Sequence, residues 1–293
     1  MSKDILYYPT IEFNSEDYQW LWISSLLWDK IYRIVPEKYS LHEPRNIQEL
    51  CSSGEIGIPL SPNRYQKMIS EDFLRKIESK DWQAAALEFH HDDVDRYSQY
   101  CRIHKDKIDV TLKNILLFDK NILEDDDWVY TSREMSNLYM TYLARHMAQE
   151  NKLSLTTNNK DIWTASTFFL HDQQIQDSFY PGSDSSESSQ EALASLILND
   201  FIPQNIMDVT AKDLLTFRER RKDERNLMIK AIDDFADSIS GITDPQILDY
   251  IVNDENKKVT YAITEYKKSM DNTQKVACPF NFVQKQRKAC LAF

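Results

Sequence analysis

Glycine is scarce in this chain, with four residues in 293. The loops that hold phosphate groups in P-loop and Rossmann proteins need several glycines close together, so that backbone amides can approach the ligand. Only Gly54 and Gly57 are near neighbours, and their stretch lacks both the third glycine of one motif and the Lys-Ser/Thr of the other. The sequence therefore argues against nucleotide binding of either kind.

Cysteine and long apolar runs are also scarce. The four cysteines lie far apart without a C-x-x-C pair, which argues against a structural zinc site or a dense disulfide framework. The longest apolar run near the N-terminus, residues 21–28, contains two serines and is much shorter than a membrane span. Pro9 interrupts the first apolar residues too early for a signal peptide. We therefore expect a cytoplasmic, soluble protein without a membrane span.

Charge and hydrophobicity narrow the class of protein further. The net charge of −12 repels nucleic acid and anionic lipid, so we expect nucleic acid to be an unlikely partner. The chain is 42% hydrophobic and has six tryptophans, which is ample for a packed core. Global disorder is excluded on this composition.

The first 35 residues predict a strand, a helix and a second strand. Residues 5–8 form an apolar run ended by Pro9, and Ser15 can cap a helix whose apolar residues recur every three or four positions. The β-branched and aromatic residues 31–35 predict a strand stopped by Pro36. This order within a short stretch is typical of a crossover between parallel strands.

Helix and strand signals continue along the chain. Ser61 and Pro62 predict the start of a helix that runs to Ile77. Further helices are expected near residues 82–100, 108–118, 135–146 and 162–179, and short strands at 128–130 and 153–157. We expect a mainly α protein with a small β-sheet of three or four strands (α/β) and a helical C-terminal part.

A serine-rich stretch, PGSDSSESSQ at residues 181–190, predicts a polar loop between two parts of the chain. Residues 1–180 are expected to form a mixed α/β body with the small sheet, and residues 191–293 a helical region. Within the second part, Thr210 to Asp213 resembles a capping box with Asp in place of Glu. The helix that it opens can run to Ile239.

Several phrases of the sequence resemble a family of uncharacterised bacterial proteins. They are LYYPTIEF at residues 6–13, then Trp20, then LLWDKIYRIVP at residues 26–36, and FIP at 201–203 followed by LLTFR at 214–218. The family has no settled activity, so the resemblance transfers no catalytic residue. Its bacterial distribution implies a role beside phage defence or mobile elements, by association alone.

Four residues resemble the metal ligands of the HD-type metal-dependent phosphohydrolases. Those helical enzymes use a histidine, a later His-Asp pair and a distant aspartate; the matching residues here are His146, His171, Asp172 and Asp233, with Asp234 or Asp237 as alternatives to the last. Imidazole and carboxylate together suit a divalent metal that activates water. The usual Gly and Lys after the pair are replaced by glutamines, and a buried histidine paired with a carboxylate is the alternative interpretation. Otherwise no cofactor is expected.

The run RERRKDERN at residues 218–226 carries five positive and three negative charges. Nine consecutive polar residues cover every face of a helix, so we expect the segment to be exposed. Its mixed signs favour contact with a protein over nucleic acid. Arg218, Arg221 and Arg225 are therefore candidate contacts with a protein partner or with a second copy of the chain.

Asp29 and Arg33 are the unusual members of the opening phrases, because they flank a strand that should be buried. They are expected either to form a structural ion pair or to line a site at the carboxyl end of the strand. At the other terminus, Cys290-Leu-Ala-Phe293 fits a prenylation box with basic residues upstream.

The leading functional hypothesis is a cytoplasmic bacterial protein that acts through protein association, in a phage-defence or mobile-element cassette. The alternatives are an HD-type phosphohydrolase and a prenylated peripheral membrane protein.

Overall fold

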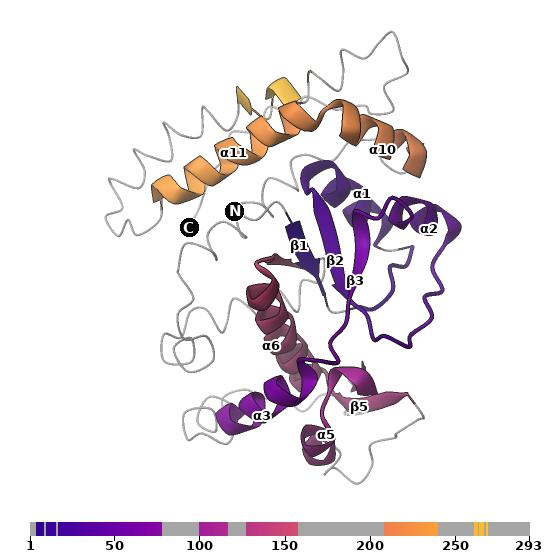
Figure 1. The fold of residues 1–293 in the computed structure, drawn as a ribbon, viewed down its shortest axis with the longest axis vertical. Helices are drawn as coiled ribbons and strands as arrows, with labels where there is room; N and C mark the ends of the chain where they lie inside the picture. The colour runs from indigo at the N-terminus through magenta and orange to yellow at the C-terminus, as the bar shows by residue number, and fades with distance from the viewer. Residues whose placement is uncertain are drawn as a thin grey trace, which may run out of the picture.

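The structure is a computed structural model that describes residues 4–8, 10–15, 17–77, 100–116, 127–157, 208–239, 261–262, 264–266 and 268. These ranges form a four-stranded parallel sheet, a two-stranded antiparallel ribbon and the helices that pack on them (Figure 1). The α/β fold class is therefore confirmed, and the described C-terminal elements are helical. The loop at 181–190 and the helices predicted at 82–99 and 162–179 lie outside the described residues, and the division into two parts stays a prediction.

The parallel sheet has the strand order β3-β2-β1-β6. Its strands are β1 (Asp4–Tyr7), β2 (Lys30–Ile34), β3 (Ile56–Leu60) and β6 (Ser154–Thr156). Helix α1 (Tyr18–Leu27) connects β1 to β2, which pair in parallel from Asp4↔Lys30 to Tyr7↔Arg33. The predicted crossover between parallel neighbours is confirmed.

Alternate residues of β1, and Tyr8 directly after it, point into two separate cores, one on each face of the sheet. Ile5 and Tyr7 pack with α1, with α2 (Arg45–Cys51) and with α10 (Ala211–Arg220). Leu6 and Tyr8 pack with α3 (Gln66–Ile77) and α6 (Arg133–Asn151). This period of two is what a strand with both faces covered requires. The sheet is thus the middle layer between two groups of helices.

The antiparallel ribbon pairs β4 (Tyr100–His104) with β5 (Trp128–Ser132). The 3-10 turn η2 (Lys105–Lys107) and helix α5 (Val110–Leu116) follow β4. Tyr100, expected at the end of a helix, begins this strand instead, and Ile103 buries its side chain in the second core. The strands predicted at 128–130 and 153–157 are confirmed as β5 and β6.

The C-terminal helices pack against the N-terminal part of the chain (Figure 1). The backbone oxygen of Val209 accepts a hydrogen bond from Trp22 Nε1 at 2.9 Å, and Tyr266 Oη donates to the oxygen of Leu26 at 2.9 Å. The Thr210 cap is confirmed, because its Oγ1 accepts from the amide of Asp213 at 3.1 Å. The single helix predicted to Ile239 is interrupted at Arg221, which separates α10 from α11 (Lys222–Ile239).

Two predicted helix starts lie a few residues too early. Helix α1 begins at Tyr18, after Asp17 rather than Ser15, and the Asp17 carboxylate accepts from Tyr7 Oη at 3.2 Å. Helix α3 begins at Gln66, after a turn in which the Gln66 amide donates to the oxygen of Pro62 at 3.0 Å. In both places a turn separates the capping signal from the first full helical residue.

Strand β3 contains both a glycine and a proline, and no strand was expected at these residues. It lies at the edge of the sheet, where the missing amide of Pro59 is tolerated. Gly57 has a φ of +70°. The register between β2 and β3 shifts at this residue: Ile31 pairs with Ile56, whereas Tyr32 pairs with Ile58. Its backbone oxygen accepts from Arg33 Nε at 3.0 Å. The bulge therefore places a carbonyl beside a buried guanidinium.

Replacing Gly57 with alanine is expected to destabilise the fold by about 2 kcal/mol, because an L-residue is strained at positive φ and the site is full. A Cβ atom there would lie 2.7 Å from Cys51 Sγ and 3.4 Å from Arg33 Cζ. Urea unfolding measures the loss. Gly54 is the matched control: its φ is +76°, yet a Cβ meets no atom within 4 Å. Equal losses at the two positions would show that strain alone, and not crowding, governs Gly57.

Candidate functional site

A charged pocket of about 300 Å³ lies where the strands of the parallel sheet begin, against α10 and α11. Asp4 starts β1, Lys30 starts β2 directly after Asp29, and Glu55 directly precedes β3. The helices close the other side with Leu215, Arg218, Glu219, Lys222 and Arg225. Eight of the nine lining residues are charged, four of each sign. This composition makes the pocket the candidate functional site.

Arg218, in the last turn of α10, is a buried cation that caps the C-terminal end of α1. Its Nη1 donates to the backbone oxygens of Ser25 and, at 2.9 Å, of Trp28. Its Nη2 donates to the oxygen of Asp29 at 2.8 Å and to Glu55 Oε2 at 3.0 Å. Helix C-termini carry partial negative charge on such carbonyls, so a guanidinium is stabilised there. Burial, followed by the nearby charge of Arg225, lowers the pKa of Arg218 from its usual value.

Arg225, in the second turn of α11, lies in the same pocket and forms an ion pair with Asp29. The side chains of Arg218 and Arg225 are each 4% exposed. The expectation that the whole run at 218–226 is exposed is therefore wrong for these two residues. These two guanidinium groups can be buried because carbonyl and carboxylate oxygens from the N-terminal part of the chain accept their hydrogen bonds. Arg221, between the two helices, is half-buried and pairs with Glu224 at 2.9 Å.

Each buried arginine also keeps one hydrogen-bond donor without an acceptor. Among the described residues, Arg218 Nε and Arg225 Nε are both buried polar atoms with no hydrogen-bond partner. At the rim, Glu219 and Lys222 are exposed and have no ion-pair partner in the part of the chain that the structure describes. Burial is also the main reason why the pKa of Asp4 is raised. The pocket is thus lined by ion-paired charges and by two exposed rim charges.

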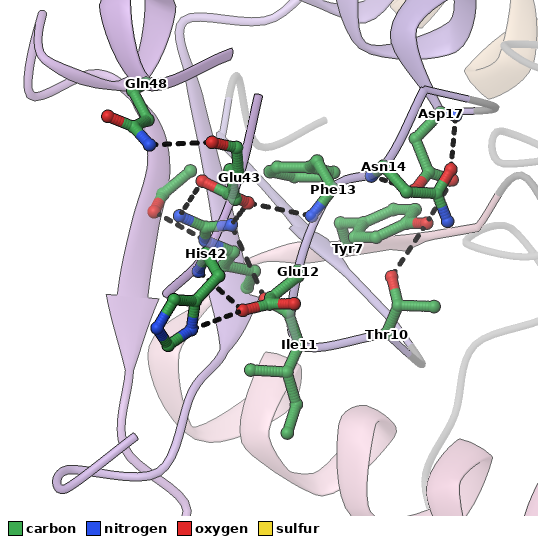
Figure 2. A network of polar contacts seen from close by, with 12 residues as sticks. Tyr7, Thr10, Ile11, Glu12, Phe13, Asn14, Asp17, His42, Glu43 and Gln48 are labelled. Carbon is green, nitrogen blue, oxygen red and sulfur yellow. Dashed lines mark hydrogen bonds and ion pairs between the residues drawn. The ribbon is translucent and has the colours of Figure 1, made fainter. Parts of the chain in front are cut away.

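The predicted pair of Asp29 and Arg33 does not form. Arg33 lies at the carboxyl end of β2 and forms a buried bidentate pair with Glu43, with Nη2 3.1 Å from Oε2. Glu43 also accepts a hydrogen bond from the amide of Phe13 at 2.8 Å (Figure 2). Arg33 therefore does form a structural ion pair, as predicted, but its partner is Glu43 and not Asp29. Asp29 instead contacts Arg225, almost 200 residues along the chain, which no local pattern could indicate.

The predicted metal ligand His146 lies between α6 and α3, beside Asp72. Its buried Nε2 is 4.0 Å from Asp72 Oδ2, which also accepts a hydrogen bond from Tyr142. Burial lowers the pKa of His146, which favours the neutral imidazole. The ammonium nitrogen of Lys76 lies 4.0 Å from the same carboxylate oxygen, a position that opposes a metal ion.

The other residues of the predicted metal set are not brought together with His146 by the described structure. His171 and Asp172 lie outside the described residues. Asp233 belongs to α11, and its side chain lies outside them too. Within the described ranges no three His, Cys, Asp or Glu side chains are grouped as metal ligands. The divalent-metal site stays a prediction.

No helix in the described ranges combines the length and hydropathy needed to cross a membrane. Cys290 and the residues around it lie outside the described part of the chain, so the prenylation box also stays a prediction. No family model, curated protein or solved structure matches this chain. The resemblance to an uncharacterised bacterial family likewise stays a prediction.

Proposed function

We propose that this protein acts by association with another protein, and that the contact surface is the rim of the charged pocket at the α10–α11 junction. The observation that carries the proposal is the lining itself, with eight charged residues of nine. Pockets for small molecules are lined mostly by apolar and aromatic side chains, whereas polar and charged groups are typical of the rim of a protein interface.

The two buried arginines fix the position of α10 and α11, which carry this surface. Arg218 joins α10 to the end of α1 and to Glu55, and Arg225 joins α11 to Asp29. The rim residues Glu219 and Lys222, for which the described ranges supply no ion-pair partner, are therefore held at a fixed place beside the sheet. A surface that is ordered before binding loses less conformational entropy when a partner arrives.

The buried positions also determine which residues can test the proposal. Charge reversal at Arg218 or Arg225 would place an unpaired acid beside other acids in the interior and would therefore test folding. Arg221 is half-buried and Lys222 is exposed, so either can be changed without placing an unpaired charge in the interior.

A double variant, Glu219→Lys with Lys222→Glu, is expected to weaken association by about tenfold, because both rim charges then face the partner with the wrong sign. Affinity capture from an extract of the host cell identifies a partner, and sedimentation of the purified protein detects self-association. The control is Lys212→Glu with Lys230→Glu, two exposed changes outside the pocket lining. Association that survives the rim variant, or is lost equally in the control, would reject this surface.

Association through charged rims is also expected to weaken when salt is raised from about 0.1 M to 1 M, since the Debye length falls from about 10 Å to 3 Å. The dissociation constant measured at both concentrations tests this expectation. A salt-independent constant would place the contact elsewhere on the molecule.

A further inference from the structure

We infer that the outer face of α11 pairs with the same face of a second copy of this chain, antiparallel, around a two-fold axis at Leu227. The face, which we call the α11 face, consists of Asp223, Leu227, Lys230 and Asp234. None of these four residues lines the charged pocket. The inference therefore goes beyond the proposed function, because it concerns another surface and commits to one occupant.

The α11 face is the side of the helix that lies opposite its buried residues. With 3.6 residues per turn, the four positions fall within an arc of about 60° around the helix axis. All four residues are exposed, whereas Arg225, Met228 and Ile229 on the opposite side are buried. The side of α11 that is packed on the rest of the chain thus leaves the α11 face accessible to a second molecule.

Leu227 gives the α11 face an apolar centre. It is 67% exposed and is one of four large hydrophobic residues that are exposed among the described residues. A single exposed leucine is ordinary at a protein surface, so it is not by itself a sign of a contact. Its position is what matters here, because it lies between charges of opposite sign. Packing two copies of Leu227 against each other would remove this apolar surface from water.

The charges of the α11 face are self-complementary. Asp223 precedes Leu227 by four residues and Lys230 follows it by three, which places them about 6 Å and 4.5 Å from it along the helix axis, on opposite sides. A two-fold axis at Leu227 therefore brings Asp223 of each copy beside Lys230 of the other. Arg220 and Asp234, seven residues before and after Leu227, repeat the same arrangement further out.

The same charges favour a second copy in the antiparallel orientation. A parallel pair in register would place Asp223 against Asp223 and Lys230 against Lys230, and like charges in contact are costly. Arg220, Asp223, Lys230 and Asp234 have no ion-pair partner in the ranges that the structure describes, and their charges sum to zero. Two copies with a net charge of −12 repel each other on average, so a balanced surface is where they can approach.

The expected dimer is weak, because one pair of helices buries less surface than the roughly 1,200–2,000 Å² of a stable interface. Sedimentation equilibrium of the full-length protein should show reversible dimerisation between about 10 µM and 1 mM. A protein that stays monomeric over this range would overturn the inference.

Charge exchange identifies the contact. Asp223→Lys and Lys230→Asp each place like charges at both pairs, and each is expected to weaken dimerisation by about tenfold or more. The double variant with both changes restores opposite charges and should recover the dimer. Asp223→Lys also makes the chain less negative overall, so net charge alone would strengthen its association. A dimer that Asp223→Lys leaves intact or strengthens, or that the double variant fails to recover, contradicts the α11 face as the contact.

Leu227→Glu tests the centre of the face and is expected to abolish the dimer, since two acids would meet at the axis. Met68→Glu is its matched control, because Met68 is a similar exposed apolar residue, 53% exposed, on α3. Equal loss in the control would reject the assignment.

The dimer and the pocket rim can be tested independently. The rim variant, Glu219→Lys with Lys222→Glu, is expected to lose a captured protein and keep the dimer, whereas Leu227→Glu is expected to do the reverse. Because Lys230 belongs to the α11 face, its change in the rim control alters the dimer, and capture of a different protein reports on the rim. A dimer lost in the rim variant but kept in Leu227→Glu would overturn the inference.

Discussion

Replacing Glu43 with alanine is expected to destabilise the protein by about 3–5 kcal/mol, because it leaves the Arg33 guanidinium buried without its counter-ion. The two side chains are 3% and 2% exposed, so water cannot replace the lost carboxylate. The change also removes the acceptor for the amide of Phe13. Arg33 would then keep, among the described residues, the backbone oxygens of Gly57 and Ile11 as acceptors. Chemical denaturation with urea or guanidinium chloride measures the free energy of unfolding.

The matched control for Glu43 changes both partners at once. Arg33→Met with Glu43→Leu replaces the ion pair with apolar side chains of similar size, and such exchanges are often neutral or stabilising. The double variant should therefore be clearly more stable than Glu43→Ala. A loss below about 1 kcal/mol for Glu43→Ala would resemble that of an exposed pair and would contradict the burial of the Arg33–Glu43 pair.

The sequence predicted those parts of the fold that local periodicity determines. Apolar β-branched runs located β1, β2 and β6, and the spacing of strand, helix and strand predicted the parallel crossover between β1 and β2. Strand β3 was missed because its Gly57 and Pro59 are signals for turns, and only the edge position and the bulge make them compatible with a strand. Strand β4 was missed because a helical pattern was extended through Tyr100.

The candidate site could be predicted only in part, because its chemistry depends on contacts between distant segments. Residues 218–226 were recognised as unusual from their charge, but a run of charged residues does not show which of them will meet carbonyl oxygens. The acceptors of Arg218 belong to residues 25–29 and 55. Asp29 was also recognised, although its partner was not. No local pattern in the sequence links these segments, since the link arises when α10 packs on α1.

The sheet gives a physical reason for the position of the site. In open parallel sheets ligands usually bind outside the carboxyl ends of the strands. At the carboxyl end of β2 in this protein, the Arg33–Glu43 pair is fully buried and packs with Phe13, whose ring lies 4.8 Å from Arg33 Cζ. The partly open charged pocket lies instead at the amino ends, where α10 and α11 approach. The chain's own side chains therefore fill the carboxyl edge at β2, whereas the amino edge leaves a pocket lined by charged residues.

Replacing Arg218 with alanine is expected to destabilise the docking of α10 and α11 by about 3–5 kcal/mol, because three backbone oxygens at the end of α1 and the carboxylate of Glu55 lose their buried donor. The effect should be local. Hydrogen exchange of amides in α10, α11 and the last turn of α1 is expected to accelerate by at least a hundredfold, while amides of α3 and α6 change little.

Two companion variants separate this role from a general loss of charge or packing. Arg220→Ala removes an exposed arginine two residues away and is expected to change stability by less than about 0.5 kcal/mol. Arg218→Lys keeps the charge, but one ammonium group cannot reach the oxygens of Trp28, Asp29 and Glu55 in the planar arrangement of a guanidinium, so it should recover only part of the loss. Full recovery by lysine would mean that charge alone holds the helices. Unchanged exchange in Arg218→Ala would mean that the apolar contacts of Phe217 and Leu214 suffice to dock α10.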